Sequence, residues 1–129
     1  MSTEISRYFT EQLKDSLDAI YFDLGISSKL SDRLEEVIRR NTIVDIAAKV
    51  EVYQKKLNDI ERKLFALEGI VKRQEKSIID NQEANKNAEV NDDIKIRQQL
   101  IVRKMKKTEG DFIRVKFDCN AFLYEVFNT

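Results

Sequence analysis

A heptad repeat in the middle of the chain constrains the fold more than any other feature. From residue 43 to residue 78, apolar or neutral side chains recur at steps of three and four, with Lys and Glu crowding both sides. The repeat is longer than the three or four heptads that favour a coiled coil over an ordinary amphipathic helix. It predicts a coiled-coil rod over residues 42–80. The predicted oligomerisation seam consists of Ile43, Ile46, Val50, Tyr53, Leu57, Ile60, Leu64, Leu67, Val71, Gln74 and Ile78.

The charges beside this seam indicate which partner it meets. In a parallel arrangement of identical chains, Lys56 faces Glu61 of a neighbour and Lys63 faces Glu68. An antiparallel arrangement would instead place Lys against Lys and Glu against Glu. We therefore predict a parallel homo-oligomer. The alternative is a single long helix that folds onto the rest of its own chain.

The seam residues also bear on the number of subunits. Leu57 and Ile60 occupy successive core positions in an order that disfavours dimers, whereas Val50 and Val71 favour two strands. Polar Gln74 can meet its copies around a threefold axis. The sequence therefore favours a trimer.

Residues 1–41 have the pattern of a pair of helices. Apolar residues recur at helical spacing from Ile5 to Leu24, and Gly25 follows them as a C-terminal cap commonly does. A second helix is predicted from Ser27 or Ser28. We expect a helical head that ends where the heptad repeat begins.

The segment after the rod is polar and then basic. Residues 81–93 form an Asn-rich break, and residues 94–110 have the pattern of a short helix that contains six basic residues and one acidic residue, Glu109. A concentrated basic stretch can contact nucleic-acid phosphates, although cations also suit the solvated C-terminal end of a helix. The candidate nucleic-acid contacts are Arg103, Lys104, Lys106 and Lys107.

The last segment, residues 111–129, alternates apolar and charged side chains as a strand does. Ile113, Val115 and Phe117 alternate with charged residues, and residues 118–120 form a plausible turn before a second aromatic run. We predict a β-hairpin, which is marginal alone and needs a docking partner. The candidate docking residues are Phe112, Val115, Phe117, Phe122, Tyr124 and Phe127.

Composition removes whole classes of site. The chain has no His, so it cannot contain a Ser-His or Cys-His catalytic couple. Its three glycines are isolated, so the sequence contains no phosphate-binding glycine loop. Cys119 is the single cysteine and is expected to be a small buried residue in a reducing compartment. We predict no catalytic, cofactor-binding or metal site, no membrane span and no signal peptide. The expected location is the cytoplasm, or the host cytoplasm or virion if the protein is viral.

Two functional classes fit this mainly α-helical layout. The first is a non-enzymatic structural protein, a connector or scaffold that binds itself and other subunits of an assembly such as a virion. The layout is similar to that of trimeric fibre and whisker proteins of tailed phages. The second is an oligomeric nucleic-acid-binding protein with a helix-turn-helix-like head or a basic patch at residues 95–107. Six basic against eight acidic residues in positions 1–42 disfavour a phosphate-binding head.

Overall fold

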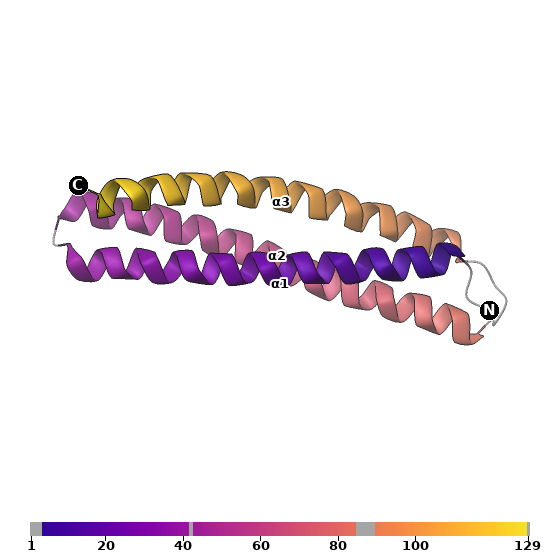
Figure 1. Ribbon diagram of the computed structural model, residues 1–129. Helices are drawn as coiled ribbons and strands as arrows, with labels where there is room; N and C mark the ends of the chain where they lie inside the picture. Colours follow the sequence, from indigo (N-terminus) through magenta and orange to yellow (C-terminus); the bar gives the residue numbers. More distant parts are fainter. Residues whose placement is uncertain (1–3, 42, 85–89, 129) are drawn as a thin grey trace. The chain divides into compact units, whose positions relative to one another are not determined.

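The computed structural model describes residues 4–41, 43–84 and 90–128 of the chain. These residues form three long helices, α1 (Glu4–Arg40), α2 (Val44–Ala84) and α3 (Asp92–Phe127), which Figure 1 shows in chain order. No strand occurs within the described ranges. The prediction of a mainly α-helical protein is confirmed.

Helix α1 is continuous through Gly25, so the predicted pair of N-terminal helices is wrong. The backbone has no positive φ at any described glycine, and the left-handed cap expected at Gly25 is therefore absent. A glycine inside a helix costs only about 1 kcal/mol relative to alanine. The apolar stripe explains why the helix continues, because Ile20, Leu30 and Leu34 all lie on one buried face of it.

The predicted β-hairpin at residues 111–129 is also wrong, because α3 runs through this segment as far as Phe127. The basic helix expected at residues 94–110 is the first half of the same element. Burial follows the helical period and not the strand period: Phe112 and Cys119 are buried, whereas Phe117 is exposed. A helix buries this stripe against its neighbours, whereas a lone hairpin would be marginal in water.

The described chain divides into two compact units, and every helix contributes a segment to each. Unit 1 combines Met1–Tyr21 with Phe65–Lys107. Unit 2 combines Phe22–Leu64 with Thr108–Thr129. Neither unit is therefore a continuous stretch of sequence.

In unit 1, polar contacts show how the three helical segments pack. Gln82 of α2 donates a hydrogen bond to Ser6 of α1, and Gln98 of α3 donates to the carbonyl of Phe9 at 3.2 Å. Asn91, just before α3, donates a hydrogen bond to Asn81 of α2. The apolar core of unit 1 consists of Leu13, Ile20, Leu67, Val71, Ile78, Val90, Ile94, Ile101 and Met105.

In unit 2, the later part of α1, the early part of α2 and the end of α3 pack together. Tyr53 of α2 stacks on Phe122 of α3 with ring centroids 5.0 Å apart, and Arg33 of α1 lies 5.2 Å from the centre of the Phe127 ring. Asp23 of α1 also lies beside Glu109 of α3, and Lys63 of α2 lies beside Asp111 of α3. Within unit 2, the segments of α1 and α3 therefore run in the same direction, and α2 runs opposite to them. The apolar core of unit 2 consists of Leu30, Leu34, Val37, Val50, Leu57, Ile60, Leu64, Phe112, Cys119, Phe122 and Leu123.

Most heptad core residues of α2 are buried within their own chain. Of the eleven predicted seam residues, only Ile43 is exposed; Ile46 and Tyr53 are half-buried, and those from Leu57 onwards are buried. The predicted parallel rod is therefore wrong as a description of the fold of this chain, and the trimer stays a prediction. A bundle of antiparallel helices within one chain repeats its core positions with the same spacing as a coiled coil between chains. The repeat alone therefore does not distinguish the two arrangements.

Within the described ranges, none of the helices is both long enough and apolar enough to cross a lipid bilayer.

Candidate interaction surfaces

Two of the six predicted docking residues lie on the surface of unit 2. Phe117 and Tyr124 are each 72% exposed, and Ile113, one turn before Phe117, is 58% exposed. Their spacings of four and seven residues place them on one face of α3. We call Ile113, Phe117 and Tyr124 the outer stripe. Single exposed apolar residues are common, but large ones aligned along a helix are typical of an interaction surface.

The other four predicted docking residues belong to the inside of unit 2. Phe112 and Phe122 are buried, while Val115 and Phe127 are half-buried. Phe127 lies under the guanidinium groups of Arg33 and Arg40, at 5.2 Å and 5.9 Å from its ring centre. Phe112, Phe122 and Phe127 thus pack inside unit 2, whereas half-buried Val115 keeps part of its surface accessible.

An open groove lies beside the outer stripe, between α2 and α3. Its volume is about 630 Å³, and Val52, Tyr53 and Tyr124 contribute to its walls. Burial, and then the nearby Asp118, raise the pKa of Tyr53 above its ordinary value. Lys49, Asp118 and Glu125 give this groove charges of both signs.

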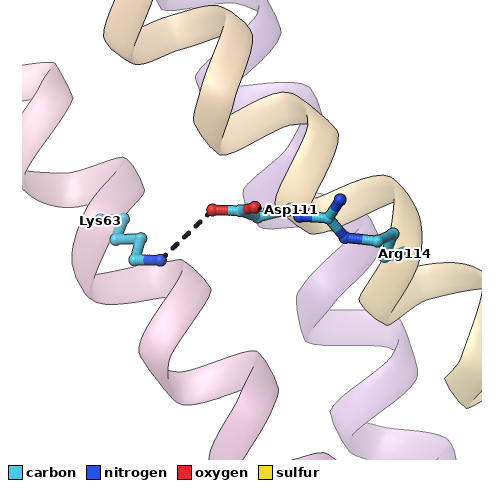
Figure 2. A network of polar contacts seen from close by, with 3 residues as sticks. All are labelled: Lys63, Asp111 and Arg114. Carbon is cyan, nitrogen blue, oxygen red and sulfur yellow. Dashed lines mark hydrogen bonds and ion pairs between the residues drawn. The ribbon is translucent and has the colours of Figure 1, made fainter.

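The charged residues predicted to pair between chains have partners within their own chain. Figure 2 shows Lys63 of α2 directed at Asp111 of α3, with Nζ and Oδ2 3.4 Å apart. Arg114 holds the other oxygen of Asp111 at 2.5 Å. Such exposed pairs contribute about 0–1 kcal/mol each and mainly select the register between helices.

The remaining members of the predicted interchain pairs also contact residues of their own chain. Glu61 accepts a hydrogen bond from Ser27 of α1 at 2.7 Å, and Glu68 lies 3.7 Å from Lys72 one turn along α2. Lys56 lies over the ring of Tyr53, 5.7 Å from its centre. The attractive pattern read from the sequence is thus compatible with an intrachain bundle.

Asp23 of α1, which is buried, and Glu109 of α3, which is half-buried, form a pair of carboxyl groups in unit 2. Asp23 is only 8% exposed, and Glu109 of α3 lies beside it. Burial raises the pKa of Asp23 to about 7, a hydrogen bond and the charge of Glu109 act in the same direction, and Lys116 opposes them. Asp23 therefore binds a proton at mildly acidic pH, and sequence reasoning gave no sign of it.

The four candidate nucleic-acid contacts lie on α3 in unit 1. Arg103, Lys104, Lys106 and Lys107 are all exposed. Their positions, at 100° per residue, spread them over a wide arc of the helix. The structure thus brings them to the surface without gathering them at one point.

A second groove lies in unit 1, again between α2 and α3, and we call it the cationic groove. Its volume is about 400 Å³. Of the predicted nucleic-acid contacts, only Lys104 lines it, together with Arg73 and Arg97, which sequence reasoning missed as site residues. The complete lining is Ile70, Arg73, Gln74, Ser77, Arg97, Leu100, Ile101 and Lys104. The one available signal was Gln74, a polar residue at a core position of the heptad repeat.

Cys119 is fully buried in unit 2, as its small size and apolar surroundings suggested. Burial raises the pKa of its thiol to about 11, although the charge of Arg33 opposes this shift. The thiolate is the reactive form, so the native thiol combines poor access with a very low thiolate fraction.

We expect Cys119 to react with a thiol reagent at pH 8 at least about a hundredfold more slowly in the folded protein than in urea. A chromogenic disulfide reagent measures both rates. A free cysteine peptide in the same urea solution corrects for the effect of the denaturant on the reagent. Equal rates for folded and unfolded protein would show that the thiol is accessible.

Among the described residues, no cluster of three or more His, Cys, Asp or Glu side chains is arranged to hold a metal ion. Comparisons with protein families, curated proteins and solved structures found no significant match to this chain.

Proposed function

We propose that the protein is a non-enzymatic assembly protein, a connector or scaffold that associates with its own copies through the outer stripe of α3. The observation that carries this proposal is the alignment of Ile113, Phe117 and Tyr124 on one exposed face. Burying such side chains against a partner stabilises the complex by a free energy of roughly 25 cal/mol per Å² of apolar surface removed from water. The seam of α2 has no part in this association, because its core positions are occupied within the chain.

The charges beside the stripe suit a twofold arrangement of two copies. When two identical helices pack antiparallel, the start of one stripe meets the end of the other, so Ile113 faces Tyr124 of the second copy. Arg114 follows Ile113, and Glu125 follows Tyr124. Opposite charges therefore approach each other at both ends of the interface. The equal numbers of acidic and basic residues add no net repulsion between copies.

A larger assembly, such as a virion, is the setting that this proposal favours, with other protein subunits as further partners. Nucleic-acid binding is the weaker candidate. Its helix-turn-helix version needs a turn near Gly25, where α1 is continuous. Its basic-patch version rests on four exposed side chains that lie along a broad arc of α3.

Replacing Phe117 and Tyr124 together with serine should weaken self-association by at least about a hundredfold, because both aromatic anchors leave the interface. Light scattering over a range of protein concentrations measures the mass. The fold should survive, since both side chains are mostly exposed.

The matched control replaces Phe65 and Ile79 with serine, two exposed apolar residues of unit 1 outside both grooves. This variant should associate like the parent protein. A parent that stays monomeric up to millimolar concentration, or a Phe117→Ser/Tyr124→Ser variant that keeps the mass of an oligomer, would contradict the proposal.

A further inference from the structure

The cationic groove of unit 1 has the dimensions of a docking site for a helix. Its lining residues are spaced by three, one and three positions on α2, and by the same steps on α3. Each wall is therefore one face of a helix over about two turns, a length of roughly 10 Å. A further helix laid between two antiparallel helices completes the four-helix arrangement that buries such faces.

The charge of the groove is of one sign. Arg73, Arg97 and Lys104 contribute three cations, and no acidic residue lines the groove. Within the described part of the chain, none of these three side chains belongs to an ion pair. The groove thus presents cations that an acidic partner can neutralise.

Arg97 is held in place by buried polar groups. Its Nε donates to Oε1 of Gln74 at 3.1 Å, and Gln74 is 98% buried. Gln74 in turn donates to the carbonyl of Ile94 at 2.8 Å and to Oε1 of Gln98 at 3.1 Å. Gln98 is itself anchored by Gln12 at 2.8 Å. The guanidinium is therefore preorganised, and its two terminal nitrogens have the fork geometry that binds a carboxylate.

The floor of the groove is apolar, which selects between classes of anionic partner. Ile70 and Ile101 line it, and Leu100 is 44% exposed there. A nucleic-acid backbone has no apolar group to bury on this floor, and no aromatic side chain in the lining can stack on a base. An amphipathic helix supplies apolar side chains at steps of three and four, with acidic residues on either side.

We propose that the cationic groove binds an acidic amphipathic helix of a partner protein. Apolar side chains of that helix cover Leu100 and Ile70. Its flanking carboxylates pair with Arg73 on one wall and with Arg97 and Lys104 on the other. This site is distinct from the outer stripe, and its occupation does not require self-association.

The test uses the full-length protein and a fluorescent helical peptide with Leu at steps of three and four and Glu on both flanks. A peptide of identical composition and scrambled order is the reference. Fluorescence anisotropy should give binding of the patterned peptide that is at least about tenfold tighter than that of the scrambled one. The Arg73→Glu/Lys104→Glu variant should lose at least about tenfold in affinity for the patterned peptide.

The matched control is Lys106→Glu/Lys107→Glu, which makes the same charge change on α3 outside the groove. It should retain the affinity of the parent protein. Replacing Glu with Lys in the peptide should restore binding to the Arg73→Glu/Lys104→Glu variant. Circular dichroism establishes that both variants are folded, and Leu100→Ser provides a second, uncharged disruption of the groove.

Several results would overturn the inference. No micromolar binding of the patterned peptide to the parent, equal binding of both peptides, or equal losses in the two charge variants would each do so. Tighter binding of a DNA duplex or of anionic lipid vesicles than of the peptide would assign the face to those partners instead. Repeating the titration with Phe117→Ser/Tyr124→Ser separates the two proposals, because peptide binding should persist when self-association is lost.

Discussion

Replacing Leu57 and Leu64 together with aspartate should unfold the protein and not merely convert an oligomer into folded monomers. Both side chains are fully buried in unit 2. Truncating one buried leucine to alanine costs about 2–5 kcal/mol, and an unpaired buried carboxylate costs more. The double change thus approaches or exceeds the roughly 5–15 kcal/mol that stabilises a typical domain. Far-UV circular dichroism should show loss of most helical signal at 25 °C.

The matched control places aspartate at Val44 and Val52, which are 80% and 51% exposed on the same helix. This variant should keep its helical signal and unfold cooperatively. If the Leu57→Asp/Leu64→Asp variant remained helical and monomeric, then the heptad seam would serve contacts between chains and the intrachain packing described above would be incorrect.

The stability of the parent protein should fall as the pH rises from 4 to 8, relative to that of an Asp23→Asn variant. Asp23 has an ordinary pKa of 3.8, and burial beside Glu109 raises its pKa to about 7 in the folded state. Between these values the folded protein holds a proton that the unfolded chain has released, so rising pH favours unfolding. Above about pH 7 both states are ionised, and this contribution levels off at its least favourable value.

Urea unfolding at pH 5 and pH 8 measures the effect. The free energy of unfolding of the parent should drop by at most about 3 kcal/mol more than that of Asp23→Asn, because water that reaches the carboxyl weakens the shift. Asparagine keeps the size of the side chain without titrating, and every other group is common to both proteins. Parallel curves for parent and variant would show that Asp23 does not hold this proton.

The groups around Asp23 define the environment in which this proton is held. Glu109 and Lys116 approach it from α3, with opposite effects on its pKa. One turn further along α1, Ser27 donates to Glu61 of α2. Lys116 therefore offers an independent check, because Lys116→Met should raise the pKa of Asp23 further and extend the fall of stability to higher pH.

The helical content and much of the core could be predicted from the spacing of apolar residues. The apolar stripe of α2 from Val50 to Ile78 was predicted, but as a seam between chains and not as a face buried within one chain, and Cys119 was expected to be buried. The partner of the stripe could not be identified in this way. An intrachain helix and a second copy of the chain fill the same core positions, and only the course of α1 and α3 distinguishes them.

The errors at Gly25 and at residues 111–129 share a physical cause. Local signals predicted a cap at Gly25 and a strand through Ile113, Val115 and Phe117. Packing overrode both, because one continuous buried stripe along each helix outweighs the modest local preferences of single residues. The interaction surfaces were more difficult to predict. The cationic groove brings Arg73 and Arg97 together from different helices, and the spacing of residues within one helix does not indicate which residues of another helix lie nearby.

Each unit combines stretches that lie far apart in the sequence, and this affects how the chain folds during its synthesis. Unit 2 draws on Phe22–Leu64 and also on Thr108–Thr129, while unit 1 draws on Met1–Tyr21 and on Phe65–Lys107. During translation the first half of the chain emerges with exposed core residues of both units and without the α3 segments that cover them. Unit 2 cannot close until Thr108–Thr129 has left the ribosome, so nascent chains depend on long-range helix docking and are vulnerable to association before it occurs.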